Sequence, residues 1–443
     1  MSVTEAQARA SHEGVPRRRQ MIAWLLAFGI LVNYFDRVNL SVAKDALHTS
    51  FGVSTFMFGV LSSTYTITYG ILQIPSGLLL DRFGVKLIGR VSTFLWSVAS
   101  FGAAIATGVP TFFSARLLLG VGEAPTFPAN AKAIGYWFPK AERTFGTSIF
   151  DGAAKLGVGL GTPLLGLLLY EFGWRWCFAA TGLISLLFFA LFAIYYRNPS
   201  EDPKVTAAER EFIARGGAQP EDKVLAAQGA PLGYLLGRKK VWGMCLGYAS
   251  YNYTFYLLVF WLPTFLSSAM HTTAVRAALY SSVPWLFATA CELLIGGVMV
   301  DKLIEHGRQA DRVRRLVLII GTSLGLALLG ATTTSRLPLA LSWITLAIGG
   351  LSAASAIGWS IPSLIAPKES VGTLGGILNT CNQISAFSAG IVTGFILRHH
   401  SFVPAMAVAA VYLTIGILGY IFLLGKIQPL PEPGEMKQLT VNN

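Results

Sequence analysis

The sequence predicts an all-α membrane protein with twelve transmembrane helices in two pseudo-symmetric halves of six. Three observations support this fold class. The 443 residues are 53% hydrophobic and 13% charged, whereas a soluble protein carries about 25% charged residues. Apolar runs of helical length recur along the whole chain. One long polar stretch, residues 198–240, divides these runs into two groups of six.

Each apolar run is long enough to span a bilayer, because about 20 helical residues cross the ~30 Å hydrocarbon core. The predicted helices cover residues 21–44, 55–80, 87–107, 111–136, 145–170, 175–197, 241–267, 276–300, 316–335, 338–364, 370–395 and 402–425. This pattern predicts two six-helix bundles joined by a central loop and flanked by two tails: 1–20, 21–197, 198–240, 241–425 and 426–443. Within the loop, a capping pattern from Thr206 to Glu209 predicts a short bracing helix that ends at Gly216.

Lysine and arginine are unevenly distributed between the two ends of the predicted helices. Most of the 34 such residues lie in the tails, the central loop and the other loops on the same side as the N-terminus. The opposite side holds Lys44, Arg175, Arg276, Arg336 and Arg398. The positive-inside rule then predicts that both termini face the cytoplasm, in the inner (plasma) membrane of a bacterium. Membrane lipid accounts for the net charge of +12, so we expect no nucleic-acid partner.

The two halves share a motif that follows their second helix. Residues 77–86 read GLLLDRFGVK, and residues 297–302 read GVMVDK. Both stretches place Gly-x-x-x-Asp and a basic residue at a helix end. Internal repeats of this kind are typical of secondary transporters. We therefore expect gating and conformational roles for Asp81, Arg82, Asp301 and Lys302.

Charged residues inside the predicted membrane helices indicate an ion or substrate path. Asp36 and Arg37 lie within the first apolar run, where each such residue costs roughly 2.5–3.5 kcal/mol near the bilayer centre. Arg116 lies at a similar depth in the fourth helix, which allows it to pair with Asp36. Glu123 follows two turns later on the same helix face. A carboxylate beside an arginine stays ionised until the arginine binds another anion, so Asp36, Glu123 and Arg116 are candidates for proton coupling.

The chain resembles the major facilitator superfamily over nearly its whole length. Residues 77–86 resemble the signature between its second and third helices, and RLLLG at 116–120 resembles its fourth-helix signature. Three stretches resemble one branch, the anion:cation symporters, which includes bacterial galactonate, glucarate and hexuronate transporters: NYFDRVNL at 33–40, RLLLGVGEAPTFP at 116–128 and WFPKAER at 137–143. The resemblance implies proton-coupled import of a small organic anion, such as an aldonate, aldarate or hexuronate.

The same resemblance implies roles for individual residues. Asp36 and Glu123 are the expected proton carriers. Arg37 is the expected ligand of the substrate carboxylate, because its planar fork matches a carboxylate. Four further side chains are expected to face the substrate cavity: Tyr34, Tyr69, Trp359 and Asn379. The alternatives are a fixed ion-pair network for the charged residues and simple packing for the aromatic ones. Residues 359–362, WSIP, also predict a helix break.

The fifth helix departs from the galactonate-type pattern. Those carriers tend to have a neutral amide where this chain has Ala154 and Lys155. Lys155 is therefore a candidate second anion contact, which favours a diacid or a smaller, more charged substrate. Asp151 stands one turn earlier and can pair with Lys155 instead. Glu292 in the eighth helix has no partner evident in the sequence and is interpreted as a gate or packing residue.

Other functions fit the sequence less well. Related organophosphate:phosphate exchangers carry an arginine in the seventh helix, but residues 241–267 contain neither lysine nor arginine. Residues 159–166, GLGTPLLG, loosely resemble a drug:proton antiporter pattern, yet a buried Arg37 fits an anion better than a cationic drug. An enzyme needs a nucleophile–base pair or metal ligands at membrane depth, and all six histidines fall in predicted loops or tails. We expect a monomer that is not an enzyme and uses no cofactor or metal.

Overall fold

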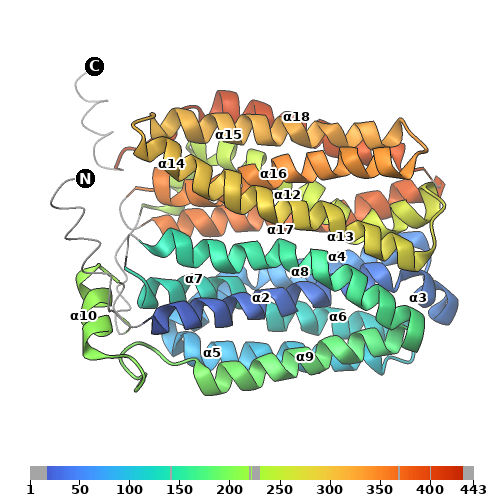
Figure 1. Cartoon of the computed structure of the whole chain (residues 1–443), viewed down its shortest axis with the longest axis horizontal. Helices are drawn as coiled ribbons and strands as arrows, with labels where there is room; N and C mark the ends of the chain where they lie inside the picture. Colours follow the sequence, from blue (N-terminus) through green and yellow to red (C-terminus); the bar gives the residue numbers. More distant parts are fainter. Residues whose placement is uncertain are drawn as a thin grey trace.

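The computed structural model describes residues 17–139, 142–218, 221, 230–367, 370–399 and 401–432. All regular secondary structure within these ranges is helical. The long helices run roughly side by side along the longest axis of the molecule (Figure 1). The short helix α10 (Ala207–Arg215) lies at one end of this array, and α3 (Lys44–Phe51) lies at the other.

The helices of the first half agree with the predicted ones except at two breaks. They are α2 (Arg18–Val42), α4 (Thr55–Ile71), α5 (Gln73–Ala104), α6 (Val109–Glu123), α7 (Thr126–Trp137), α8 (Arg143–Phe172) and α9 (Trp174–Tyr195). The predicted helix 55–80 is broken at Leu72, and the helix 111–136 is broken at Ala124 and Pro125. Proline has no N–H to continue the helical ladder, which explains the second break. Within α5, Gly84 turns the chain with a φ of 74°, a conformation that glycine adopts without steric cost.

The second half continues the same pattern. It contains α12 (Lys239–Thr264) with η2 (Phe265–Ala269), α13 (Ala274–Cys291) with η3 (Glu292–Met299) and α14 (Val300–Glu305), α15 (Ala310–Leu324) with η4 (Gly325–Thr332), α16 (Leu337–Ile365), α17 (Val371–Ile396) with η5 (Leu397–His399), and α18 (Val403–Leu418) with η6 (Gly419–Leu424). The short α11 (Leu232–Leu236) precedes them. The predicted break at residues 359–362 is wrong, because α16 continues through Pro362 to Ile365.

Eight helical segments in the described ranges are long and apolar enough to cross a membrane. The other four predicted helices do not meet this criterion of length and apolarity; they contain α4, α6, α12 and α17. The breaks leave α4 and α6 short, with 17 and 15 residues. By contrast, α12 is long but is buried along nearly its whole length. A helix that faces other helices instead of lipid can carry polar residues such as Asn252.

The two halves are related by a pseudo-twofold axis, and they meet through helices at equivalent positions in each half. The second helix of each half packs against the fifth helix of the other half, so α4 contacts α17 and α13 contacts α8. The first of these contacts is very close, because a Cβ added to Gly59 would lie 2.6 Å from the carbonyl oxygen of Gly390. Small residues allow the backbones of membrane helices to approach in this way. Equivalent helices of the two halves therefore form the interface.

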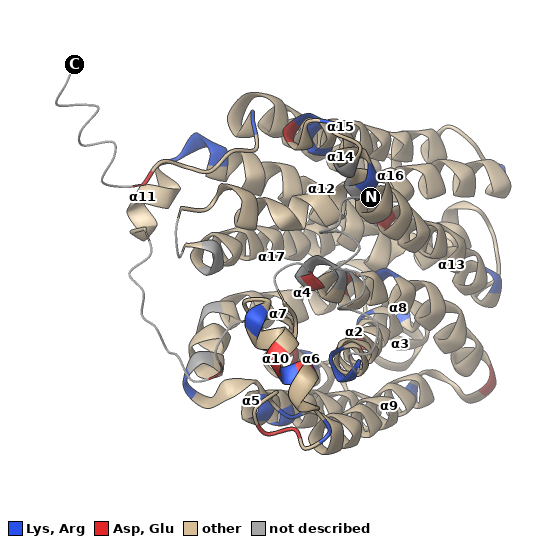
Figure 2. Ribbon diagram, turned by 60° about the vertical axis from the view of Figure 1, so that its left-hand side comes forward, with Lys and Arg blue, Asp and Glu red and all other residues tan. Residues whose placement is uncertain are grey.

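The helix α10 is attached to the start of α2 by a buried carboxylate. Thr206 caps α10 by accepting a hydrogen bond from the backbone N–H of Glu209, as the capping pattern predicts. Glu209 in turn accepts hydrogen bonds from the backbone N–H groups of Arg18 and Arg19 and from the Arg19 guanidinium. The carboxylate thus caps the positive end of the α2 dipole. Figure 2 shows that charged residues gather at this end of the molecule, around α10, α14 and α15.

We expect Glu209→Gln to lower the free energy of unfolding by about 1–3 kcal/mol, because the buried acceptor that caps α2 loses its charge. Thermal unfolding of the purified protein in detergent measures this effect. Glu211→Gln is the matched control, since Glu211 lies on the same helix with its side chain 60% exposed. An equal change in both variants would contradict the bracing role of Glu209.

Candidate functional site

A narrow cavity of about 60 Å³ lies between the two halves. Six side chains predicted to bind substrate line it: Tyr34, Arg37, Tyr69, Lys155, Trp359 and Asn379. Asn382 and Gln383, which follow on α17, line it as well. Small-molecule sites usually measure at least roughly 300 Å³. This cavity is several times smaller than such a site, so the two halves must move apart before it can admit a small-molecule ligand.

Arg37 lies in this cavity inside a cage of tyrosines. Its carbon Cζ is 4.3, 5.1 and 5.4 Å from the ring centroids of Tyr34, Tyr65 and Tyr69. Its Nη1 donates a hydrogen bond of 2.7 Å to the hydroxyl of Tyr256. Its Nη2 has no hydrogen-bond partner within the described part of the chain, although the side chain is only 2% exposed. An unpaired buried donor is costly, and this nitrogen is free to donate a hydrogen bond to a group that enters the cavity.

Glu123 is the ionic partner of Arg37. Its Oε2 lies 3.4 Å from Arg37 Nε, and its Oε1 has no hydrogen-bond partner among the described residues. The carboxylate is completely buried and comes from the last residue of α6, directly before the break at Ala124. An anion that binds Arg37 therefore competes with Glu123 for the same guanidinium.

Asp36 and Arg116 do not form the predicted ion pair. Arg116 Nη1 donates instead to the backbone carbonyl of Asp36, at 3.1 Å. The Asp36 carboxylate accepts hydrogen bonds from Ser100 of α5, at 2.6 Å, and from Ser185 of α9, at 3.0 Å. Successive side chains of a helix point about 100° apart. Asp36 accordingly points into the first half, whereas its neighbour Arg37 faces the cavity.

Lys155 forms a second charged cluster at the cavity. Its ammonium lies 3.2 Å from Asp151 Oδ2, in the pair that the spacing predicts, and 2.9 Å from Glu292 Oε2. Glu292 is the first residue of η3 in the second half. The residue for which the sequence shows no partner thus finds one across the interface, and Lys155 connects the two halves.

Aromatic and amide side chains complete the cavity wall. The ring of Trp359 lies 5.8 Å from that of Tyr248, centroid to centroid. Asn379 donates a hydrogen bond of 2.6 Å to the side-chain oxygen of Gln73, which in turn donates to the backbone carbonyl of Ala124. Gln73 therefore joins α17 to both breaks in the first half, at Leu72 and at Ala124.

The repeated motif lies away from the cavity. Arg82 and Lys302 are exposed, and Arg82 Cζ stands 5.2 Å from the ring centroid of Phe83. The side chains of Asp81 and Asp301 lie outside the described part of the structure. The gating role of these four residues stays a prediction.

Several site residues escaped the sequence analysis. Tyr65, Tyr256 and Gln73 contact the predicted ligands directly, and Ser100 and Ser185 bind Asp36. One signal pointed to Tyr256: residues 248–256 contain four tyrosines, an unusual density for a membrane helix. The two serines carry no signal, because only tertiary packing brings them to Asp36.

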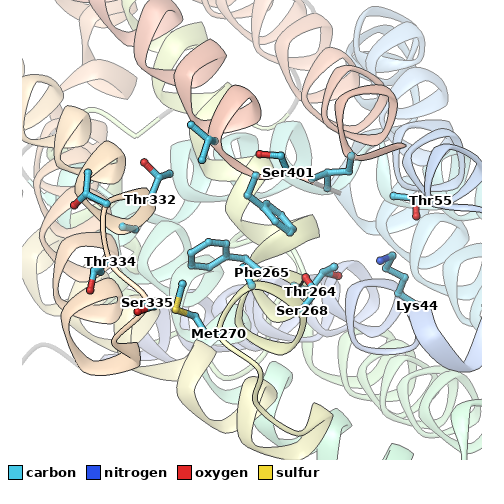
Figure 3. Close-up of a pocket in the computed structure, with 16 residues that line it drawn as sticks. Lys44, Thr55, Thr264, Phe265, Ser268, Met270, Thr332, Thr334, Ser335 and Ser401 are labelled. Carbon is cyan, nitrogen blue, oxygen red and sulfur yellow. Dashed lines mark hydrogen bonds between the residues drawn. The ribbon is translucent and has the colours of Figure 1, made fainter. Parts of the chain in front are cut away.

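Figure 3 shows a larger cavity, of about 680 Å³. Its lining includes Lys44, the first residue of α3, which lies at the end of the molecule opposite α10 (Figure 1). Many hydroxyl side chains line the cavity as well. The Lys44 ammonium lies 5.9 and 5.7 Å from the ring centroids of Phe58 and Trp261, which pack edge to face. Both rings are completely buried.

Comparison with known proteins places these features in a family. Residues 26–390 match the model of the Major Facilitator Superfamily. The chain is 36% identical to the transporter YybO of Bacillus subtilis, over 96% of this chain and 99% of that protein. It is 31% identical to the "Probable galactarate/D-glucarate transporter GarP" of Escherichia coli K12, over 93% and 95% of the two chains. It is 28% identical to the D-galactonate transporter of E. coli O6:H1, over 93% and 97%.

A solved structure has the same fold. The bacterial homologue of the human lysosomal transporter Spinster, in an inward-facing and occupied conformation, superposes with a TM-score of 0.71 over 93% of this chain and 97% of that one, at 17% identity. The helical architecture, the repeated halves and the family match lead to one conclusion. The chain is a multi-pass membrane transporter that belongs to the Major Facilitator Superfamily.

Proposed function

We propose that this transporter imports a small organic anion together with protons, and that the anion is a sugar acid such as an aldonate, aldarate or hexuronate. The observation that carries the proposal is the unpaired Nη2 of buried Arg37 at the cavity between the halves. A guanidinium can give a carboxylate two parallel hydrogen bonds. Two relatives are named for substrates of this class, galactarate/D-glucarate and D-galactonate.

Substrate recognition uses the remaining cavity residues. Tyr34, Tyr69 and Trp359 provide ring faces and polar edges for the carbon chain and hydroxyl groups of the sugar acid. Asn379 offers an amide that can both donate and accept hydrogen bonds. Lys155 provides a second positive charge at the same cavity. A neutral sugar would leave the Arg37 donor unpaired, so the site favours anions.

The proton enters the cycle through Glu123. A substrate carboxylate that binds Arg37 displaces Glu123 from Nε. The displaced carboxylate then binds a proton, because an unpaired charge in a buried site costs more than a neutral acid. When the substrate leaves, Glu123 releases the proton and pairs with Arg37 again. Arg116 lies on the same helix as Glu123 and donates a hydrogen bond to the backbone carbonyl of Asp36. Movement of α6 is therefore linked to Asp36, the other proton carrier.

Alternating access follows from the two halves. The predicted bundles at 21–197 and 241–425 rock against each other around the cavity, as in other secondary transporters. The motif residues Asp81, Arg82, Asp301 and Lys302 stabilise one of the two states. We place both termini in the cytoplasm, the protein in the plasma membrane, and one cavity in each monomer.

The decisive experiment uses purified protein in liposomes with an inward proton gradient and an internal pH dye. Galactonate, gluconate, glucarate, glucuronate, tartrate and neutral sugars are added one at a time. Acidification with one or more of the acids and with none of the sugars supports the proposal. If none of the acids caused acidification with protein shown to be folded, the proposal would be overturned. Counterflow with phosphate esters and efflux of cationic dyes then test exchange and drug export.

Asp36→Asn is expected to abolish gradient-driven accumulation while leaving the protein folded. The asparagine side chain can still accept a hydrogen bond from Ser100 or Ser185, but it cannot carry a proton. Uptake of the radiolabelled acid with and without a pH gradient measures the effect. Asp45→Asn is the matched control, because Asp45 is an exposed aspartate in α3, the short helix that follows α2. Full accumulation by Asp36→Asn would remove Asp36 from the coupling scheme.

A further inference from the structure

Lys155 stands between two carboxylates that come from opposite halves of the protein. Its ammonium contacts Asp151, one turn earlier on α8, and both carboxylate oxygens of Glu292, at 3.0 and 2.9 Å. The side chains of Lys155 and Glu292 are 3% and 5% exposed, and that of Asp151 is 15% exposed. Asp151 and Lys155 line the cavity that holds Arg37.

The charges of this cluster do not balance. Two carboxylates share one ammonium, so the fully ionised cluster carries a net charge of −1 in a buried position. The neighbouring helix α12 lines the same cavity with side chains that are all neutral: Tyr248, Tyr251, Asn252, Phe255 and Tyr256. On its other side, η3 packs against Ala353 and Ala356 of α16. No further cation of the described residues pairs with Asp151 or Glu292. A buried unpaired charge is costly, and a proton is the simplest way to remove it.

The backbone at Glu292 supports a functional role. Glu292 opens η3, a π-helical segment of eight residues between α13 and α14. Short π-helical segments frequently occur at functional sites, where they re-aim side chains. The segment here directs a carboxylate across the interface between the halves.

We propose that Glu292 is a further proton-binding residue, in addition to Glu123 and Asp36, and that its protonation frees Lys155 to bind the second carboxylate of a dicarboxylic sugar acid. This inference rests on the proposed function. The first substrate carboxylate displaces Glu123 from Arg37, and the second displaces Glu292 from Lys155. Asp151 stays beside Lys155 on the same helix. Each displaced carboxylate binds one proton, so a dianionic aldarate moves with one proton more than a monoanionic aldonate, in addition to any proton that Asp36 carries.

Wild-type protein in liposomes tests this rule directly. The substrate gradient that just balances a known pH gradient gives the number of protons per substrate. We expect one more proton per glucarate than per gluconate. Equal numbers for the two acids, or no transport of glucarate beside normal transport of gluconate, would overturn the inference while leaving the proposed function standing. Failure of every acid to move protons would instead reject the proposed function itself.

The variant Glu292→Gln assigns the additional proton. We expect the number of protons per glucarate to fall by one, so that it equals the number per gluconate. Glucarate uptake then carries one positive charge fewer inward than in the wild type, so an inside-negative potential, set with potassium and valinomycin, favours it less. Glu171→Gln is the matched control, because Glu171 is exposed on α8. An unchanged ratio for glucarate in Glu292→Gln would overturn the role of this residue.

A second variant tests the freed lysine independently. Lys155→Gln removes the ligand of the second carboxylate but retains Arg37. We expect glucarate uptake efficiency to fall at least tenfold more than gluconate uptake efficiency. Equal losses for both acids would show that Lys155 only holds the halves together. The wild-type proton ratio decides the proposal even if either variant fails to insert.

Discussion

Transport of every acid is expected to disappear when Arg37 is replaced by glutamine. The guanidinium is the central donor of the cavity, with Tyr256 on Nη1, Glu123 near Nε and an unpaired Nη2. Breaking a buried charge pair by removing one partner costs ~3–5 kcal/mol, and a loss of about 3 kcal/mol in binding is already more than a 100-fold change in affinity. Substrate binding to the purified protein, measured by calorimetry, checks the expectation.

Arg37→Lys is expected to fail almost as completely. A lysine ammonium is a single point charge, so it cannot hold Tyr256 and a substrate carboxylate in the geometry of a planar fork. The double variant Arg37→Gln/Glu123→Gln removes both charges and so distinguishes an effect on folding from an effect on binding. We expect this variant to fold but not to bind the substrate. Arg398→Gln, an exposed arginine, is the control for general loss of charge. Wild-type binding by Arg37→Lys would refute the carboxylate-fork role of Arg37.

Glu123→Gln is expected to separate substrate movement from proton movement. The amide is similar in size and can still hydrogen-bond, but it can neither take up nor release a proton. Accumulation driven by a pH gradient should therefore be lost, by at least an order of magnitude, while counterflow of labelled against unlabelled substrate persists. Parallel assays in the same liposomes measure both activities. Loss of both would show that Glu123 is needed for structure or binding, not for coupling alone.

The same variant should change how binding depends on pH. In the wild type, ionised Glu123 competes with the substrate for Arg37, so substrate affinity should fall as pH rises and the carboxylate loses its proton. In Glu123→Gln this competitor is absent at every pH, so the affinity for a monocarboxylate such as gluconate should stay nearly constant. Binding measured across a pH series distinguishes the two curves. A parallel fall in both proteins would assign the pH dependence to another group.

Much of the fold could be predicted from local features of the sequence. The length of the apolar runs, the asymmetric distribution of lysine and arginine and the repeated motif do not depend on contacts between distant residues. The breaks at Leu72 and Ala124 were harder to predict. Pro125 signals the second break, but leucine is compatible with a helix, so Leu72 gives no signal for the first. The side chain of Gln73 stabilises both breaks through a contact with Ala124.

The candidate site was only partly predictable. Arg37 and Glu123 could be identified as candidate site residues because a charge within an apolar helix is energetically costly and usually marks a functional site. The structure then distinguished two neighbouring residues, since Arg37 faces the cavity whereas Asp36 is bound by serines inside the first half. Adjacent positions on a helix differ by about 100° in direction. The direction of each side chain depends on which helices pack around it.

The sequence by itself determined that this chain is a membrane-spanning helical protein with two related halves and buried charges, because hydrophobicity and repetition are properties of the chain alone. Only the tertiary structure decided which charges are partners. The link between Lys155 and Glu292 spans 137 positions, and that between Arg37 and Tyr256 spans 219. Such pairs form because the two halves pack against each other, and no local pattern in the sequence records that contact.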